Sequence, residues 1–159
     1  RVALLKSLPV SVFDTVIKSI HLSKNAQEFI SILQKKGILV GLVSGGFTPI
    51  VERLAKSLGI SYFTANQLEV KDGFLTGKLV GEIVTGKVKQ ATLEIWRKEL
   101  GLSNERTIAI GDGANDLLML KSAGCSIAFC AKEIVKSEIA CHVDTRDFLE
   151  VLPLIDFLE

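Results

Sequence analysis

Short apolar runs that alternate with amphipathic segments are the feature that most constrains the fold of this chain. The run "ILVGLVS" (38–44) is continuous and apolar, which is typical of a strand covered on both faces. Further strands are expected at 106–110, 125–129 and 141–143. Helices are expected between the strands, at about 24–36, around 51–58, and at 86–100, 115–123, 132–139 and 147–157. This alternation predicts an α/β fold with a Rossmann-like parallel sheet and helices on both faces.

Two segments depart from the alternation. Residues 66–84 change to a period of two around Asp72 and Gly73, and this dipeptide is the strongest short-range signal for a β-hairpin. Residues 1–20 are expected to be helical. Glycines at positions 37, 59 and 101 are expected to end the helices that precede them.

The charge balance excludes several classes of partner. The chain has 159 residues, with 19 basic and 18 acidic side chains and a formal net charge of +1. Binding to nucleic acid or a membrane surface requires a basic excess on one face, so neither is expected as a partner, and a homodimer stays open. No apolar run approaches the ~20 residues that cross a bilayer. Cys125, Cys130 and Cys141 are expected to be buried thiols of a reducing compartment, the cytoplasm.

The first candidate site is "LVSGG", at the predicted junction of a strand and a helix. The Ser44 hydroxyl and the unhindered backbone N–H of Gly45 suit a phosphate group at a helix start. The alternative is an ordinary tight turn in which Ser44 caps the helix. Taken alone, these residues favour the alternative.

The second candidate site is "GDGANDLL", where Asp112 follows a predicted strand and Asp116 comes four residues later. Carboxylates are hard oxygen ligands that suit Mg²⁺, and the second one is placed to brace the first. The alternative is that Asp112 only favours the start of a helix. The two flanking glycines leave the backbone open to a ligand and favour the metal.

Two cations complete the candidates. Lys89, on the first turns of a predicted helix, is suited to neutralising phosphate charge, and the Arg1 guanidinium is suited to gripping a carboxylate with two hydrogen bonds. Each of them, considered alone, is an ordinary solvated side chain.

The order of these motifs resembles the haloacid dehalogenase superfamily of phosphotransferases, whose second, third and fourth motifs match at Ser44, Lys89 and Asp112 to Asp116. Within the superfamily, five stretches are similar to the phosphoserine phosphatase family, in the same order along the chain: "RVALLKSLP", "LVSGGF", "NQLEVKDGFLTGKLVGEIV", "AIGDGANDLLML" and "IAFCAK". The resemblance implies that Ser44 and Gly45 hold the transferring phosphoryl group. It implies further that Lys89 stabilises the nucleophile and the phosphate charge.

Three more expectations come from the same resemblance. Asn115 would contact the substrate or its phosphate, and Arg1 would bind the carboxylate of the substrate. Mg²⁺ would be held by Asp112, with Asp116 in support. The reaction would have two steps, in which an aspartate attacks phosphorus and water then hydrolyses the aspartyl-phosphate.

The first motif of the family, Asp-x-Asp-x-Thr, is absent, because no two aspartates in the sequence are separated by one residue. That motif carries the nucleophile and the acid/base on a central strand, between the strands that lead to Ser44 and Asp112. We expect the motif upstream of Arg1, and we expect the 159 residues alone to be inactive.

The expected organisation is the remainder of a helical cap at residues 1–20 and an α/β phosphatase core at 21–159. The expected function is magnesium-dependent hydrolysis of O-phosphoserine, in the last step of serine biosynthesis. Two alternatives stay open: a phosphatase for another small phosphorylated metabolite, and a non-catalytic phosphate-binding module that lacks the nucleophile.

Overall fold

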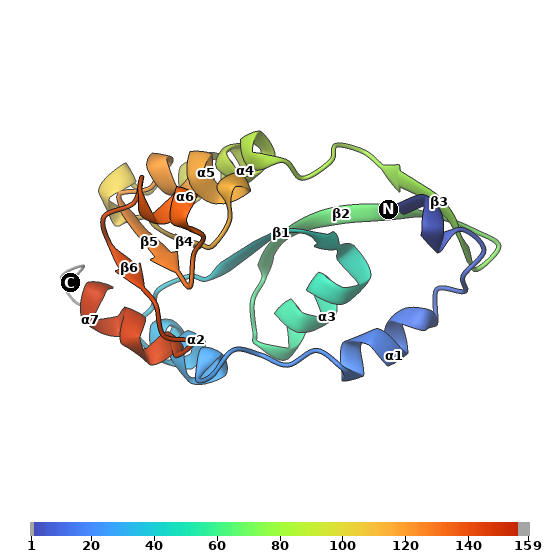
Figure 1. Cartoon of the computed structure of the whole chain (residues 1–159), viewed down its shortest axis with the longest axis horizontal. Helices are drawn as coiled ribbons and strands as arrows, with labels where there is room; N and C mark the ends of the chain where they lie inside the picture. The colour runs from blue at the N-terminus through green and yellow to red at the C-terminus, as the bar shows by residue number, and fades with distance from the viewer. Residues whose placement is uncertain (1, 156–159) are drawn as a thin grey trace. The chain divides into compact units, whose positions relative to one another are not determined.

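The computed structural model describes residues 2–155 (Figure 1). The chain forms two compact units, one made of the residues up to 21 together with 33–84, the other of 22–32 together with the residues from 85 onward. The predicted division into a cap and a core at residue 20 stays a prediction. Within the described range, none of the helices has the length and apolar composition that crossing a lipid bilayer requires.

The first unit contains a three-stranded sheet of order β1-β2-β3, formed by β1 (Gly41–Phe47), β2 (Tyr62–Lys71) and β3 (Phe74–Val80). β1 and β2 are parallel, while β2 and β3 are antiparallel. Asp72 and Gly73, with φ of 51° and 82°, join β2 to β3. A two-residue turn with both φ positive matches the twist of its strands, so the predicted hairpin is confirmed.

Helix α3 (Thr48–Ser57) connects β1 to β2 and contacts both strands. It buries Val51 and Ala55, and Gly59, with φ of 65°, follows its end as predicted. The predicted strand at 38–44 lies three residues later, at 41–47. Its predicted burial on both faces is wrong, because no residue of β1 is buried. The physical reason is that β1 pairs only with β2 among the described strands, so it is an edge strand here.

The predicted helix at 1–20 is interrupted. A 3-10 helix, η1 (Val2–Leu5), is followed by an irregular stretch and then by α1 (Val12–Lys18). The stretch between them makes backbone hydrogen bonds to the hairpin: the Ser7 N–H donates to the Leu75 carbonyl at 2.8 Å, and the Val10 N–H to the Gly73 carbonyl at 3.0 Å. Phe13 of α1 then packs into a buried cluster with Leu68 and Leu75. Bonding to a distant strand has replaced local helix formation.

The second unit contains a sheet of order β4-β5-β6 whose strands are all parallel. The strands are β4 (Ile108–Gly111), β5 (Cys125–Phe129) and β6 (His142–Val143). The helical elements of this unit are α4 (Gly86–Glu99), η2 (Asn104–Arg106), η3 (Ala114–Asp116), α5 (Leu117–Ser122), α6 (Glu133–Lys136), η4 (Phe148–Val151) and α7 (Leu152–Ile155). Strand and helix alternate as predicted, which gives the α/β fold.

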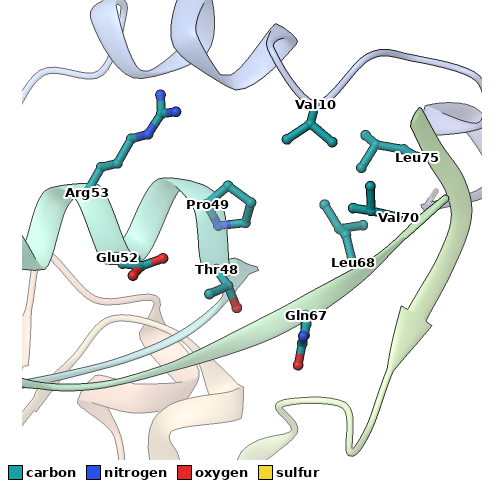
Figure 2. Close-up of a pocket in the computed structure, with 9 residues that line it drawn as sticks. All are labelled: Val10, Thr48, Pro49, Glu52, Arg53, Gln67, Leu68, Val70 and Leu75. Atoms are coloured by element: carbon teal, nitrogen blue, oxygen red, sulfur yellow. The ribbon is translucent and has the colours of Figure 1, made fainter. Parts of the chain in front are cut away.

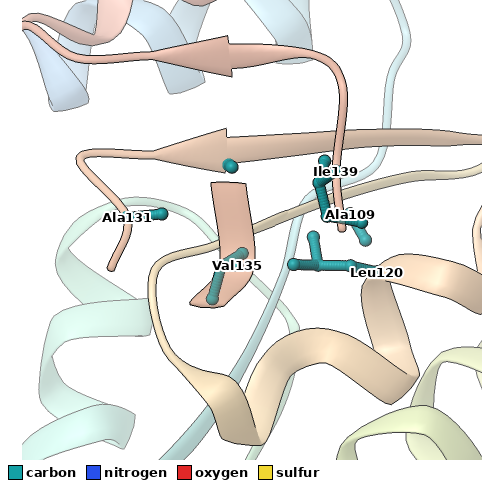
Figure 3. Close-up of a cluster of buried hydrophobic side chains, with 6 residues drawn as sticks. Ala109, Leu120, Ala131, Val135 and Ile139 are labelled. Carbon is teal, nitrogen blue, oxygen red and sulfur yellow. The ribbon is translucent and has the colours of Figure 1, made fainter. Parts of the chain in front are cut away.

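A core cluster of the second unit lies between this sheet and the helices α5 and α6. Figure 3 shows Ala109 of β4, Leu120 of α5 and Val135 of α6 gathered in one cluster. A separate aromatic contact joins Phe148 of η4 to Phe129 of β5, whose rings stack with centroids 4.1 Å apart. Helix α2 (Ala26–Lys35) begins in this unit, where its Phe29 ring lies 5.5 Å from that of Phe148. Figure 1 shows α5 and α6 on one side of the sheet and α7 on the other.

Among the described residues, the strands of the predicted parallel sheet and of the hairpin form two sheets of three strands each. β1 and β4, the strands that lead to the two candidate motifs, are both edge strands among the residues described. The three cysteines, predicted to be buried, are half-buried free thiols.

Candidate functional site

The acidic turn follows β4 directly. Asp112 comes immediately after the last residue of β4. The Asp116 carboxylate folds back onto the backbone at the start of this turn. Its Oδ2 accepts the N–H groups of Asp112 at 3.1 Å and Gly113 at 3.0 Å. Its Oδ1 accepts a proton of the Lys89 ammonium at 2.6 Å. Asp116 therefore holds the backbone that carries Asp112.

This packing depends on a glycine. A Cβ added to Gly111 would lie 2.6 Å from the Cβ of Asp116, far inside van der Waals contact. The Cβ of Asp116 is bonded to its own backbone and cannot rotate away. The first glycine of the motif is therefore required for the buried position of Asp116 and not for an unusual φ.

Lys89 and Asp116 form a buried ion pair. The side chains of Lys89 and Asp116 are 8% and 7% exposed, so the interpretation of Lys89 as a solvated surface residue is wrong. Lys89 lies on the first turns of α4, whose N-cap Thr85 accepts the N–H of Val88. Burial raises the pKa of the Asp116 carboxyl, but Lys89 and the two backbone N–H groups outweigh burial and hold that pKa below its ordinary value.

Asp112 differs from Asp116 in its exposure and in its bonding partners. It is exposed, and among the residues that the structure describes its carboxylate has no hydrogen-bond or ion-pair partner. It lines a cavity of about 350 Å³ together with Gly111, Phe129, Cys130 and Arg146. The bonds to the turn amides are made by Asp116, which leaves the Asp112 carboxylate free for a ligand.

The donor set fits a hard cation only in part. Mg²⁺ is commonly held by one or two carboxylates, several waters and substrate phosphate. Asp112 supplies one free carboxylate of this kind, while both oxygens of Asp116 are engaged, so Asp116 fits the supporting role. Within residues 2–155, no group of three or more His, Cys, Asp or Glu side chains is gathered as a metal site.

Two further residues of this cavity were not found from the sequence. Cys130 follows β5 directly, and Arg146 follows β6 by three residues. Because the carboxyl ends of parallel strands meet at one edge of a sheet, their positions after two strands were a usable signal. Asn115 lies on the same turn as Asp112 and is exposed.

The serine-glycine motif lies in the first unit, at the carboxyl end of β1. The Ser44 hydroxyl oxygen accepts the Gly46 N–H at 3.0 Å, and Gly45 is exposed. The structure thus brings Lys89, Asp112, Asn115 and Asp116 together in one unit and places Ser44 and Gly45 in the other. Arg1 lies outside the described residues.

A separate cavity of about 280 Å³ lies in the first unit and contains none of the predicted site residues. Figure 2 shows Val10, Leu68 and Leu75 pointing into it, with Arg53 on the neighbouring helix α3. Arg53 is paired with Asp14 at 2.5 Å. The lining of this cavity is mainly apolar, and the guanidinium in it is already paired with a carboxylate.

Comparison with known proteins agrees with the motifs. The sequence model of the haloacid dehalogenase-like hydrolases matches residues 2–121. A phosphoserine phosphatase of Streptococcus thermophilus is 53% identical over 156 residues, which is 98% of this chain and 73% of the relative. A phosphoserine phosphatase of Methanocaldococcus jannaschii is 44% identical over 155 residues, 98% of this chain and 74% of the relative.

Solved structures give the same answer. A substrate-bound phosphoserine phosphatase complex superposes with a TM-score of 0.91 at 43% identity, over 96% of this chain and 73% of that one. A phospho-aspartyl intermediate analogue of phosphoserine phosphatase gives a TM-score of 0.90 at the same identity and coverage. With the fold, the order of the motifs and these relatives in agreement, the chain belongs to the haloacid dehalogenase-like hydrolases, among relatives that are phosphoserine phosphatases.

Proposed function

We propose that this protein is a magnesium-dependent phosphatase that hydrolyses O-phosphoserine to serine and phosphate, in the last step of serine biosynthesis. The observation that carries the proposal is the free Asp112 carboxylate, held at the end of β4 by a buried Lys89–Asp116 pair. Relatives at 53% and 44% identity are phosphoserine phosphatases, which supports the choice of substrate.

Each residue has a chemical role in this proposal. Asp112 would hold Mg²⁺, which when bound neutralises phosphate charge and polarises the phosphoryl oxygens. Lys89 donates one ammonium proton to Asp116 and keeps two for phosphate oxygens. Ser44 and Gly45 would donate to the phosphoryl group, and Asn115 would contact the substrate.

The nucleophile is the part of the chemistry that these residues do not supply. In the proposed reaction an aspartate attacks phosphorus, the bond between phosphorus and the serine oxygen breaks, and water then cleaves the aspartyl-phosphate. No Asp-x-Asp-x-Thr motif occurs in the sequence. The sequence upstream of Arg1 separates the enzyme from a second candidate function, a phosphate-binding module without turnover: an Asp-x-Asp-x-Thr motif there supports the enzyme, and its absence there supports the module. The proposed partner is a small molecule, and neither nucleic acid nor a membrane is proposed as a partner. The proposed location is the cytoplasm. A homodimer stays a prediction.

An Asp112→Asn variant of the full-length gene product tests the function. The substitution keeps the shape of the side chain and removes the charge that would hold the metal. We expect phosphoserine turnover that requires Mg²⁺ in the wild type and a loss of at least about a hundredfold in the variant, with Tm nearly unchanged.

The control is Asp14→Asn, which removes a half-exposed carboxylate paired with Arg53. We expect this control to keep its turnover. Normal magnesium-dependent turnover in Asp112→Asn would refute the metal assignment. Phosphate binding without turnover in the wild type would favour the binding module.

A further inference from the structure

The parallel pairing of β1 with β2 is broken at the serine-glycine motif. Ser44 pairs with Ala65, and the next pair joins Phe47 to Asn66, so two residues of β1 lie opposite none of β2. These two residues are Gly45 and Gly46. An insertion of this kind takes the extra residues out of the ladder and turns their backbone groups away from the neighbouring strand.

The side chain of Asn66 replaces the missing ladder partner. Its Nδ2 donates to the Gly45 carbonyl at 2.7 Å, and its Oδ1 accepts the Val84 N–H at 2.8 Å. Asn66 is 6% exposed, so water does not compete for these bonds. A carbonyl accepts and an N–H donates, so only a side chain with one donor and one acceptor satisfies both, and an amide does this without a charge.

The peptide unit between Gly45 and Gly46 is consequently held at both ends. Asn66 binds its carbonyl, and the Ser44 hydroxyl oxygen accepts its N–H at 3.0 Å. Because that oxygen acts as an acceptor within the protein, the hydroxyl proton of Ser44 stays available for a ligand. The peptide orientation therefore decides whether Ser44 presents a donor.

We propose that Asn66 is a positioning residue for phosphate binding: it fixes the peptide between Gly45 and Gly46 and, through it, orients the Ser44 hydroxyl as a donor to the phosphoryl group. Asn66 itself touches no substrate in this arrangement. The inference rests on the proposed function, because it takes Ser44 and Gly45 as the groups that hold phosphate.

The test compares Asn66→Asp with Gln34→Glu in the full-length gene product. Asn66→Asp keeps the shape and the acceptor for Val84 but removes the donor to Gly45. Gln34, an exposed residue of the same unit, is the control for the change from an amide to a carboxylate, because its Nε2 donates to the carbonyls of Leu58 at 3.0 Å and Gly59 at 3.1 Å. Each substitution thus replaces an amide that binds a backbone carbonyl by a carboxylate.

We expect Asn66→Asp to lower kcat/KM about tenfold to a hundredfold, and by the same factor for phosphoserine and for an aryl phosphate, because both carry the phosphoryl group. Its affinity for inorganic phosphate should fall with it. Hydrogen exchange at the Gly46 amide should accelerate at least about tenfold relative to its neighbours. Gln34→Glu should leave kcat/KM and the Gly46 exchange within about twofold of wild type.

A pH profile separates positioning from a general loss of structure. Burial raises the pKa of a carboxyl group, and the protonated form of the substituted side chain can donate to Gly45 and accept from Val84 like the amide. The kcat/KM of Asn66→Asp relative to wild type should therefore rise as the pH falls from 8 to about 5. The ratio for Gln34→Glu should stay flat.

Asn66→Ala removes both bonds without burying a charge. It replaces Asn66→Asp where the latter does not fold, and it excludes charge repulsion as the cause. Equal losses in the Asn66 variants and Gln34→Glu would overturn the inference, as would unchanged kcat/KM together with accelerated Gly46 exchange. If the wild type neither turns over phosphoserine nor binds phosphate, the proposed function fails. The phosphate-binding part of the inference fails with it, and the Gly46 exchange then decides only whether Asn66 fixes the peptide between Gly45 and Gly46: accelerated exchange supports this, and unchanged exchange refutes it.

Discussion

The buried pair of Lys89 and Asp116 should dominate the stability of the acidic turn. Asp116→Asn keeps an oxygen for the N–H groups of Asp112 and Gly113 but turns a donor toward the Lys89 ammonium, which is then buried without its counter-charge. Removing one partner of a buried pair costs about 3–5 kcal/mol. Because the two amide bonds survive, we take the lower end, about 3 kcal/mol. At roughly 2–4 °C per kcal/mol for a domain of this size, Tm should fall by about 6–12 °C.

The matched control is an ion pair of similar length at the surface. Lys121 and Glu138 are 2.7 Å apart, with side chains 51% and 48% exposed. An exposed pair contributes about 0–1 kcal/mol, so Glu138→Gln should change Tm by less than about 4 °C. Both variants are measured in the full-length gene product, by urea unfolding and by calorimetry. The two pairs match in length and in the kind of charge, so the contrast between them reports mainly on burial.

A double-mutant cycle completes the test. Lys89→Met removes the cation with little change in volume, and Lys89→Met combined with Asp116→Asn leaves no unpaired charge. The double variant should be at least about 2 kcal/mol more stable than the sum of the single losses predicts. If Asp116→Asn loses less than about 1 kcal/mol, or if the single losses add, the pair does not carry the turn and the reasoning is refuted.

Three further predictions concern pH, packing and the substrate. Because Lys89 and two N–H groups hold the pKa of Asp116 low, its stabilisation is present above about pH 4 and is lost as the pH falls through the folded-state pKa, so acid unfolding curves should be flatter in Asp116→Asn than in wild type. Gly111→Ala should cost about 1–3 kcal/mol in urea unfolding, because its methyl group meets the Cβ of Asp116, whereas Gly45→Ala, with no atom nearer than 4.0 Å, should be neutral to stability; equal losses would contradict this. Arg1→Ala in the full-length gene product should lower kcat/KM for phosphoserine about tenfold to a hundredfold and leave an aryl phosphate unchanged, since only the former has a carboxylate, and equal effects on both would assign Arg1 to another role.

Local signals in the sequence predicted most of the elements correctly. The Asp72-Gly73 dipeptide determines a turn through its own backbone preferences, and Gly59 and Gly101 follow helix ends with φ of 65° and 63° for the same reason. The strands after residue 100 were predicted because a short apolar run between two amphipathic helical segments is typical of a buried strand. Each of these signals acts over a few residues, so it can be recognised without the rest of the chain.

The tertiary structure decided what depends on distant residues. The predicted helix at 1–20 lost its middle to bonds with Gly73 and Leu75 of the hairpin, which no local pattern reveals. Lys89 has the sequence surroundings of a surface lysine, and only its contact with Asp116, 27 residues later, shows that it is buried.

No motif in the sequence assigned a role to Asn66. Its role comes from the two residues by which β1 slips against β2, and from partners 21 residues earlier and 18 residues later. The sequence by itself therefore determined the identity of the chemical groups and the elements that carry them. The tertiary structure decided which groups are buried, paired or free, because burial and hydrogen bonding are set by whatever packs alongside and not by neighbours in the chain.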